Sequence, residues 1–371
     1  MKFSRHLPFI FGMLTALSAH AETRMPFVEV AADGRGFRLT GTGQRFVPWG
    51  FNYDHDNASR LIEDYWLKEW DAVAGDFREM KALGANTVRV HLQFGRFFPR
   101  AGEPEAENVR QLTRLLALAE ETGLYLDVTG LGCYRKSDTP AWYDALDETG
   151  RWQAQAKFWE TIAAACAKSP AVFCYDLMNE PVAPVGRGAP GAWLGPPFGG
   201  PDGFCFVQYI SRDQAERDRA AIAARWIETL TAAIRRHDKK HLVTVGLVDW
   251  SLDLPAHLYS GFAPTKIAAS LDFISVHLYP RDGKLDEDLA TLAAFAKAGK
   301  PVVIEETFPL NASMETFAKF IEASRKDAAG WFGFYWGRSP DELDSKTSIQ
   351  DALMKAWLEY FRAHANSGEH P

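Results

Sequence analysis

The sequence has few features that would place the chain in a membrane or on nucleic acid. Its one N-terminal apolar run, Leu7 to Leu17, is too short to span a bilayer, and no later run is both long and free of charge. Acidic residues number 48 against 41 basic ones, so the net charge is −7. This charge disfavours nucleic acid and anionic membranes as partners. We expect neither of them, and the sequence implies no protein partner.

Cysteine is also scarce, with four residues and none at zinc-ligand spacing. Cys166 lies in a helical pattern and Cys174 in an apolar strand pattern, so both are expected to be small buried residues. Cys133 and Cys205 fall in predicted loops. In an oxidising compartment these two could form a disulfide, which the sequence alone does not decide.

The N-terminus has the pattern of an export signal. Lys2 and Arg5 precede the apolar run, and Ala19 to Ala21 offer the small residues that a signal peptidase reads. We therefore predict a signal peptide over residues 1–21 and a secreted or periplasmic protein; an uncleaved anchor is the alternative. No linker, charge block or repeat divides residues 22–371, which predicts a single catalytic domain.

Short β-rich apolar runs alternate with amphipathic helical patterns along the whole chain. Eight such runs occur, at Phe46–Asn52, Ala85–Leu92, Leu124–Thr129, Ala171–Asn179, His241–Leu247, Asp272–Leu278, Pro301–Glu306 and Gly330–Trp336. Helical patterns cover Trp70–Leu83, Glu107–Thr122, Gln153–Lys168, Asp213–Arg236, Asp286–Ala298, Ser313–Arg325 and Asp341–His364.

Continuous apolar strands are typical of parallel sheets that helices cover on both faces. Alternating strands and helices indicate an α/β protein, and eight units in one undivided chain favour a (β/α)8 TIM barrel over an open doubly wound sheet. A β-hairpin pattern around Asp33 precedes the first run and can close the bottom of such a barrel.

In these barrels the chemistry lies at the C-terminal ends of the strands. Polar and reactive side chains gather at that point of the predicted strands. They are Asn52, Asp54, His55, Arg89, His91, Thr129, Asn179, Glu180, His277, Tyr279, Glu306 and Trp336. A scattered distribution along the runs would be expected if they were structural only.

Two carboxylates stand out among these residues. Glu180 directly follows the fourth run and precedes Pro181, which cannot continue the ladder. The seventh run ends in Glu305 and Glu306, and strand alternation would send only one of them into the barrel mouth. The pattern does not say which one.

Two carboxylates that converge on one mouth suit the cleavage of a glycosidic bond, in which one acts as an acid and the other as a nucleophile or base. Arg89 is the candidate cation beside them, and the Tyr279 hydroxyl is a candidate donor. The structural alternative is that both glutamates belong to ion pairs.

Five sequence pieces in order resemble glycoside hydrolase family 5, a family of retaining (β/α)8 glycosidases. They are Gly84-Ala-Asn-Thr-Val-Arg-Val90, Leu177-Met-Asn-Glu-Pro181, His277-Leu-Tyr279, Pro301-Val-Val-Ile-Glu-Glu306 and Phe334-Tyr-Trp336. The resemblance extends from about Phe27 to the end of the chain.

The resemblance implies a role for each matching residue. Glu180 would be the acid/base and Glu306, by register with the family's strand, the nucleophile. The substrate-contacting residues would be Arg89 and Tyr279 beside the nucleophile, Asn179 on the sugar 2-hydroxyl, His277 on the sugar or the acid/base, and Trp336 as the subsite floor.

One position departs from the family pattern. Many cellulase-type members carry a histidine at the end of the third strand, where this chain has Thr129 and Gly130. The pair Glu305-Glu306 resembles mannanase-like members instead. We draw no substrate from either observation.

Other residues of the predicted mouth have weaker patterns. Asn52 and Asp54 are interpreted as sugar contacts rather than metal ligands, because neighbours on an extended loop do not all point one way. His91 is expected to be a hydrogen-bonded histidine of the inner mouth. The long segment Val182–Gln208 carries aromatic residues and predicts a lid or wall of the cleft, or a loop folded on its own cluster.

The sequence therefore predicts hydrolysis of β-linked poly- or oligosaccharides by double displacement, with no metal and no organic cofactor. A transglycosylase would use the same residues, and an inactive carbohydrate-binding barrel is a further alternative. A metal-dependent barrel hydrolase using His55, His91 and His277 is a third.

Overall fold

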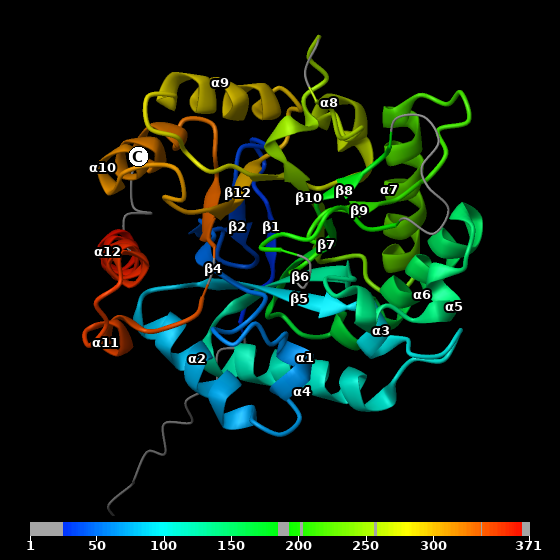
Figure 1. Cartoon of the computed structure of the whole chain (residues 1–371), viewed down its shortest axis with the longest axis horizontal. Coiled ribbons are helices and arrows are strands. Elements are labelled where there is room, and N and C mark those ends of the chain that lie inside the picture. The colour runs from blue at the N-terminus through cyan, green and yellow to red at the C-terminus, as the bar shows by residue number, and fades with distance from the viewer. Residues whose placement is uncertain (1–24, 185–192, 201–202, 256–257, 335, 366–371) are drawn as a thin grey trace, which may run out of the picture.

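Eight parallel strands close into a barrel in the computed structural model of the protein (Figure 1). The structure describes residues 25–184, 193–200, 203–255, 258–334 and 336–365. The order around the barrel is β10-β11-β12-β13-β4-β5-β6-β7. The strands are β4 (Trp49–Tyr53), β5 (Thr87–Gln93), β6 (Tyr125–Gly132), β7 (Val172–Asn179), β10 (Leu242–Val248), β11 (Ile274–His277), β12 (Val302–Thr307) and β13 (Gly330–Gly333). The predicted TIM barrel is confirmed. The predicted signal peptide lies outside the described residues.

Helices follow the strands and cover the outside of the barrel (Figure 1). The longer ones are α2 (Trp70–Ala82), α4 (Ala106–Thr122), α6 (Glu148–Cys166), α7 (Arg219–Arg235), α9 (Leu285–Ala296), α10 (Met314–Ser324) and α12 (Ile349–His364). Four-residue helices are α1 (Ile62–Tyr65), α3 (Phe94–Phe97), α5 (Ala141–Asp144), α8 (Pro264–Ile267) and α11 (Pro340–Leu343).

Capping residues explain two differences from the predicted helices. The helix expected from Asp213 begins only at Arg219, because the Asp218 side chain accepts a hydrogen bond from Ala221 N and caps it. The single helix expected over 341–364 is divided into α11 and α12, each of which starts at its own serine N-cap, Ser339 and Ser348. Local side-chain capping thus outweighs the continuous helical periodicity at both places.

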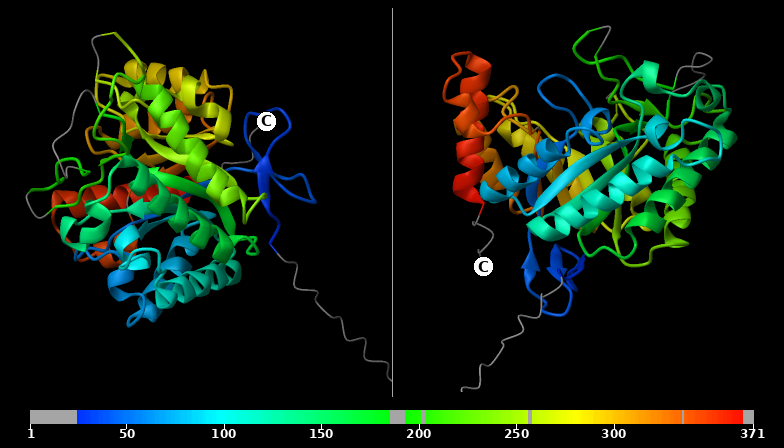
Figure 2. Two further views of the ribbon diagram at one scale, coloured as in Figure 1. Left: turned by 90° about the vertical axis from the view of Figure 1, so that its right-hand side faces the viewer. Right: turned by 90° about the horizontal axis from the view of Figure 1, so that it is seen from below.

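A small antiparallel sheet of β1 (Val28–Val30), β2 (Phe37–Leu39) and β3 (Arg45–Phe46) projects from one end of the barrel (Figure 2). Phe37 packs edge-on against Phe173 and Phe273, which lie at the start of barrel strands. The predicted hairpin therefore does close the barrel bottom. Phe46 belongs to this sheet through its pairing with Phe37, and not to the first barrel strand as expected.

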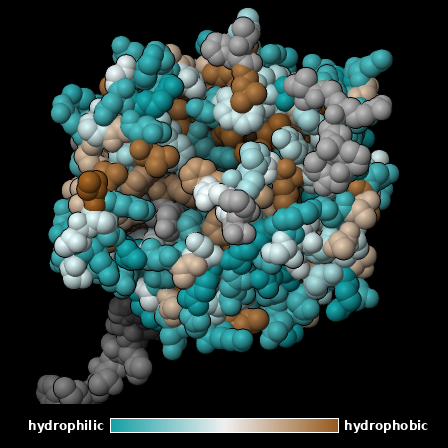
Figure 3. Space-filling view, viewed as in Figure 1, coloured by the Kyte–Doolittle hydropathy of each residue, from teal (hydrophilic) through white to brown (hydrophobic). Residues whose placement is uncertain are grey.

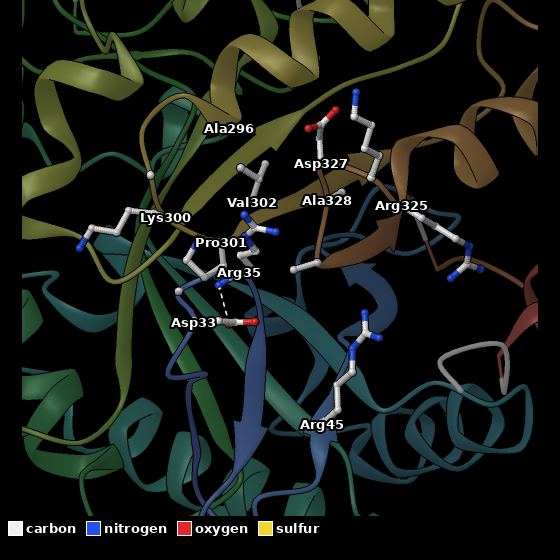
Figure 4. Close-up of a pocket in the computed structure, with 14 residues that line it drawn as sticks. Asp33, Arg35, Arg45, Ala296, Lys300, Pro301, Val302, Arg325, Asp327 and Ala328 are labelled. Carbon is white, nitrogen blue, oxygen red and sulfur yellow. Dashed lines mark hydrogen bonds between the residues drawn. The ribbon is translucent and has the colours of Figure 1, made fainter. Parts of the chain in front are cut away.

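A basic pocket lies at this closed end, between the small sheet and the segments that lead into β12 and β13 (Figure 4). Arg35, Arg45, Lys300 and Arg325 line it together with Asp33 and Asp327. The pocket is at the opposite end of the strands from the predicted mouth. It is therefore separate from the candidate active site.

The four cysteines are all buried and free, so the disulfide considered for Cys133 and Cys205 is not present in the structure. Trp66 is a packing residue, fully buried with its indole N–H donated to Asn108 Oδ1 at 3.1 Å. Trp70 is partly buried beneath the Arg114 guanidinium. In the described part of the chain no helix combines the length and apolar character that crossing a membrane requires.

Candidate active site

Arg89 lies on β5, and its guanidinium is fully buried inside the barrel. This guanidinium connects residues from several strand ends. Its Nη1 donates to Asn52 Oδ1 at 3.0 Å and to Glu306 Oε1 at 2.6 Å. Its Nη2 donates to Asp176 Oδ2 at 2.7 Å and to Asn179 Oδ1 at 3.0 Å. Burial lowers the pKa of Arg89, but the surrounding carboxylates raise it well above its ordinary value. Arg89 is therefore a permanent cation.

Glu306, on β12, receives two strong donors. Besides Arg89, the Tyr279 hydroxyl donates to Glu306 Oε2 at 2.7 Å. Burial raises the pKa of Glu306 above its ordinary value, although the positive charges of His277 and Arg89 act in the opposite direction. Each oxygen of Glu306 thus accepts a short hydrogen bond, as the oxygens of an ionised carboxylate do.

Glu180 follows β7 with a left-handed φ of 47°, which is uncommon for a residue with a side chain. Its backbone N–H donates to Gly246 O at 3.0 Å, which helps to hold this conformation. Strained backbone of this kind persists where the surrounding structure fixes it, and it is frequent at active sites. One carboxylate oxygen of Glu180 lies within 4.8 Å of one oxygen of Glu306.

His277 connects the two glutamates. Its Nδ1 lies 3.0 Å from Glu180 Oε1 and 3.5 Å from Glu306 Oε2, while its Nε2 lies 3.5 Å from Glu305 Oε2. Burial lowers the pKa of His277, but the charge of Glu306 and the hydrogen bonds of Glu180 and Glu305 outweigh it and raise the pKa to about 10. His277 is therefore a protonated donor at neutral pH.

Glu305 and Glu306 both point into the barrel, contrary to the expectation from strand alternation. Val276 of β11 pairs with Ile304 of β12, but the next residue, His277, pairs with Glu306. Glu305 is therefore an extra residue in a β-bulge. Glu305 lies below Glu306, is fully buried and accepts a hydrogen bond from Ser275 Oγ at 2.9 Å. Burial raises its pKa, but Arg89, His277 and Asp127 lower it to about 2.

Two aspartates beneath the mouth were missed in the sequence analysis. Asp176 accepts from Thr129 Oγ1 at 2.8 Å and from Gly246 N at 2.7 Å, as well as from Arg89. Burial, followed by the charges of Glu305 and Asp176, raises the pKa of Asp127 well above its ordinary value. An isolated charged residue inside an apolar strand run, as at both positions, was the available signal.

His91 lies at the inner mouth and is hydrogen-bonded on both ring nitrogens. Nδ1 is 2.5 Å from the Tyr134 hydroxyl and Nε2 is 3.2 Å from Asn52 Oδ1. Burial and the nearby charge of Arg89 lower its pKa well below the ordinary value, so the ring is neutral. The Asn52 side chain also donates to Glu305 O at 2.9 Å and thereby ties β4 to the bulge of β12.

Trp336 packs into the buried core beside Phe51. It is 2% exposed, its ring centroid lies 5.3 Å from that of Phe51, and its backbone N–H donates to Asn52 O. Phe334 is instead the partly exposed aromatic residue after β13, and its ring lies 6.5 Å from that of Tyr279. The face of the molecule seen in Figure 3 is hollowed near its centre and has apolar residues around the hollow.

Two groups of side chains in the described chain have the spacing of metal ligands. They are Glu180–His277–Glu306 and Asp127–Asp176–Glu305. Arg89 already pairs with a carboxylate of each group, and neither group contains His55 or His91. The three-histidine set considered for a metal-dependent hydrolase is therefore not assembled among the described residues.

The fold is a closed parallel (β/α)8 barrel, and two carboxylates lie close together at its strand ends. The family model for Cellulase (glycosyl hydrolase family 5) matches residues 32–340. The chain belongs to this family, as its resemblance implied. The description of this family is that of glycosyl hydrolases.

The curated relatives that match share low sequence identity with this chain. Mannan endo-1,4-beta-mannosidase A of Emericella nidulans is 24% identical over 220 residues, which cover 54% of this chain and 48% of the relative. The chain thus matches about half the length of that relative.

Among solved structures, the exo-beta-1,4-mannosidase Op5Man5 from Opitutaceae bacterium strain TAV5 is 20% identical with a TM-score of 0.63, covering 91% of this chain and 62% of its own. The beta-mannanase of the blue mussel Mytilus edulis is 17% identical with a TM-score of 0.61, covering 93% and 98%. These likenesses support the fold.

Proposed function

We propose that the protein hydrolyses β-mannosidic bonds with net retention, with Glu306 as nucleophile and Glu180 as acid/base. The observation that carries this proposal is the approach of one oxygen of Glu180 to within 4.8 Å of one oxygen of Glu306. Retaining glycosidases place their carboxyl groups about 5–5.5 Å apart, whereas inverting enzymes leave about 6.5–9.5 Å for a water molecule. The short approach favours retention.

In the first step Glu306 attacks the anomeric carbon while Glu180 gives its proton to the departing oxygen. In the second step Glu180 takes a proton from water, which attacks the same carbon and releases Glu306. Arg89 and Tyr279 favour the ionised form of Glu306 and aim it, each through a hydrogen bond to a different oxygen. These fixed donors need no reorganisation when the reaction begins.

His277 and Asn179 have supporting roles in this mechanism. Protonated His277 donates to Glu180 and lies beside Glu306, so it moderates the repulsion between the two carboxylates. Asn179 is oriented through its Oδ1 by Arg89, and its amide group is the donor that we assign to the sugar 2-hydroxyl. In this structure that amide donates to Phe206 O at 3.2 Å.

The mannosyl part of the proposal is supported by the curated relatives. Both of those with significant similarity are named as mannan endo-1,4-beta-mannosidases, one of them as probable. Hydrolysis rates on matched aryl β-mannosides, β-glucosides and β-xylosides test the choice of sugar.

Azide trapping tests the two carboxylate roles. The Glu306→Gly variant should lose turnover of an aryl β-mannoside by roughly 10⁴-fold or more. Azide should restore cleavage and give α-mannosyl azide, because it enters from the face that the missing nucleophile left open. Glu180→Ala should give β-mannosyl azide, because its glycosyl-enzyme still forms on Glu306. If neither variant yields an azide product, or the two configurations are exchanged, the assignment is wrong.

A further inference from the structure

The end of the long segment after β7 forms an aromatic wall at the mouth of the barrel. We call Phe204 and Phe206, the two aromatic residues concerned, the wall. The Phe206 ring lies 5.2 Å from that of Tyr134 and 6.1 Å from that of Phe334. The Phe204 ring lies 5.2 Å from that of His55. The wall therefore makes contacts with the loops that follow three different barrel strands.

Backbone contacts hold the wall in this position. Phe206 O accepts the amide of Asn179 at 3.2 Å, and Gln208 N donates to Glu180 O at 3.2 Å. Cys205 N, between the two wall residues, donates to Tyr134 O at 2.8 Å. The wall is thus bound to the same residues that carry the chemistry. Both of its rings remain partly exposed.

The order of the strands shows which side of the mouth is closed. His55, Phe334 and Tyr134 follow β4, β13 and β6, which lie on one arc of the barrel, β13-β4-β5-β6. Glu180 and His277 end β7 and β11, on the opposite arc. In the proposed mechanism the leaving group departs beside Glu180, and we assign the other arc, where the rings of the wall make their contacts, to the non-reducing end of the bound sugar.

A polar group follows β4 directly, next to His55, whose ring Phe204 contacts. Asp54 is 1% exposed, and its Oδ2 accepts from His55 Nδ1 at 2.8 Å. Its Oδ1 is buried and has no hydrogen-bond partner within the described residues. A buried carboxylate oxygen without a donor is costly unless something else supplies one. A hydroxyl group at the end of a sugar chain is a donor of the right kind.

From this arrangement we infer that the enzyme acts as an exo-glycosidase, releasing one terminal sugar from the non-reducing end of a β-linked oligosaccharide. The wall excludes a further sugar on the glycone side, and Asp54 receives a hydroxyl of the terminal residue. This inference rests on the proposed function. It differs from the endo action in the names of the curated relatives.

Product analysis of a labelled oligosaccharide tests the inference. β-1,4-Mannopentaose carrying 2-aminobenzamide at its reducing end is the probe, with the matching cellopentaose in parallel in case the sugar is glucose. We expect the free monosaccharide and the labelled product one sugar shorter as the first products. First products that include a free disaccharide or trisaccharide would overturn exo action while leaving the retaining mechanism in place. Absence of all β-glycosidase activity, aryl glycosides included, would overturn both.

Opening the wall provides a second test. Phe204→Ala and Phe206→Ala remove the rings and keep the backbone groups that hold Asn179 and Tyr134. In these variants release of disaccharide should rise at least tenfold relative to the wild type, while the aryl β-mannoside is still cleaved. Ile349→Ala, at the start of α12 and 90% exposed, is the control and should keep the wild-type products. Unchanged products from folded wall variants would contradict the inference.

Discussion

Glu305 and Glu306 are neighbours in the sequence, yet both contact the same guanidinium. Arg89 lies 3.5 Å from Glu305 Oε2 through Nη2 and 2.6 Å from Glu306 Oε1 through Nη1. The bulge in β12 makes this possible by turning two consecutive side chains inward. Glu305 is thus placed beneath the proposed nucleophile, where it has no access to substrate but shares its cation.

The first prediction separates these two glutamates. Glu305→Gln keeps the size of the side chain and its hydrogen bond with Ser275, so the aryl β-mannosidase activity should fall by about tenfold or less, the scale of one buried hydrogen-bond contact. Glu306→Gln should reduce kcat by roughly 10⁴-fold or more. Steady-state kinetics of the two purified variants decide the matter. The reverse order of losses would exchange the roles of the two residues.

The second prediction concerns Glu180. Glu180→Ala should lose about 10²–10⁴-fold in kcat/KM on a substrate with a poor leaving group, which needs protonation. On a dinitrophenyl β-mannoside the first step should remain close to the wild-type rate, because that leaving group departs without a proton. A stopped-flow burst of dinitrophenolate measures the first step directly. Equal losses on both substrates would show that Glu180 is not the acid.

The third prediction is a pH dependence of stability that arises from His277. Its pKa is raised from 6.5 to about 10 in the folded protein, so the folded state keeps a proton that the unfolded chain releases. This stabilisation is complete below pH 6.5 and is lost as the pH rises through about 10.

Thermal unfolding at intervals across this range checks it. As the pH rises from 6.5 to 10, the midpoint temperature of unfolding should fall more steeply for the wild type than for His277→Asn. Parallel curves for the two proteins in that window would mean that His277 is not protonated in the folded state.

The fourth prediction concerns metal ions. A carboxylate of each group with ligand spacing already pairs with Arg89, so activity should not depend on an added cation. Incubation with EDTA followed by removal of the chelator should leave kcat/KM unchanged. A loss that Zn²⁺ or Ca²⁺ restores would contradict the proposed mechanism, and elemental analysis of the purified protein would identify the ion.

The fifth prediction tests the packing of the barrel against α12. A Cβ atom at Gly333 would lie 1.8 Å from the Trp357 ring, so Gly333→Ala should destabilise the protein by about 1–3 kcal/mol through overpacking. Gly75→Ala, within α2 and with nothing inside 4 Å, is the control and should stabilise by about 0.5–1 kcal/mol. Urea unfolding of both variants measures the difference. Equal free energies of unfolding for the two variants would show that the Trp357 ring moves aside at little cost.

Much of the fold could be predicted because barrel strands are buried on both faces and therefore appear as continuous apolar runs. The placement of Glu180, Arg89 and Tyr279 at strand ends follows from the same pattern. The sequence could not show the bulge at Glu305, since strand periodicity presumes regular pairing. It also could not show that Trp336 turns into a buried site beside Phe51, because the strand ends three residues earlier at Gly333.

The sequence by itself determined the barrel, the family and the set of polar residues at the strand ends, because these depend on local periodicity and on motifs of adjacent residues. Only the tertiary structure decided which carboxylates meet, because that depends on the register between strands far apart in the chain. It also placed Phe204 and Phe206 across the mouth, since the course of a long segment depends on the contacts that it makes with distant loops. The proposed exo specificity therefore rests on tertiary contacts, and the family rests on sequence.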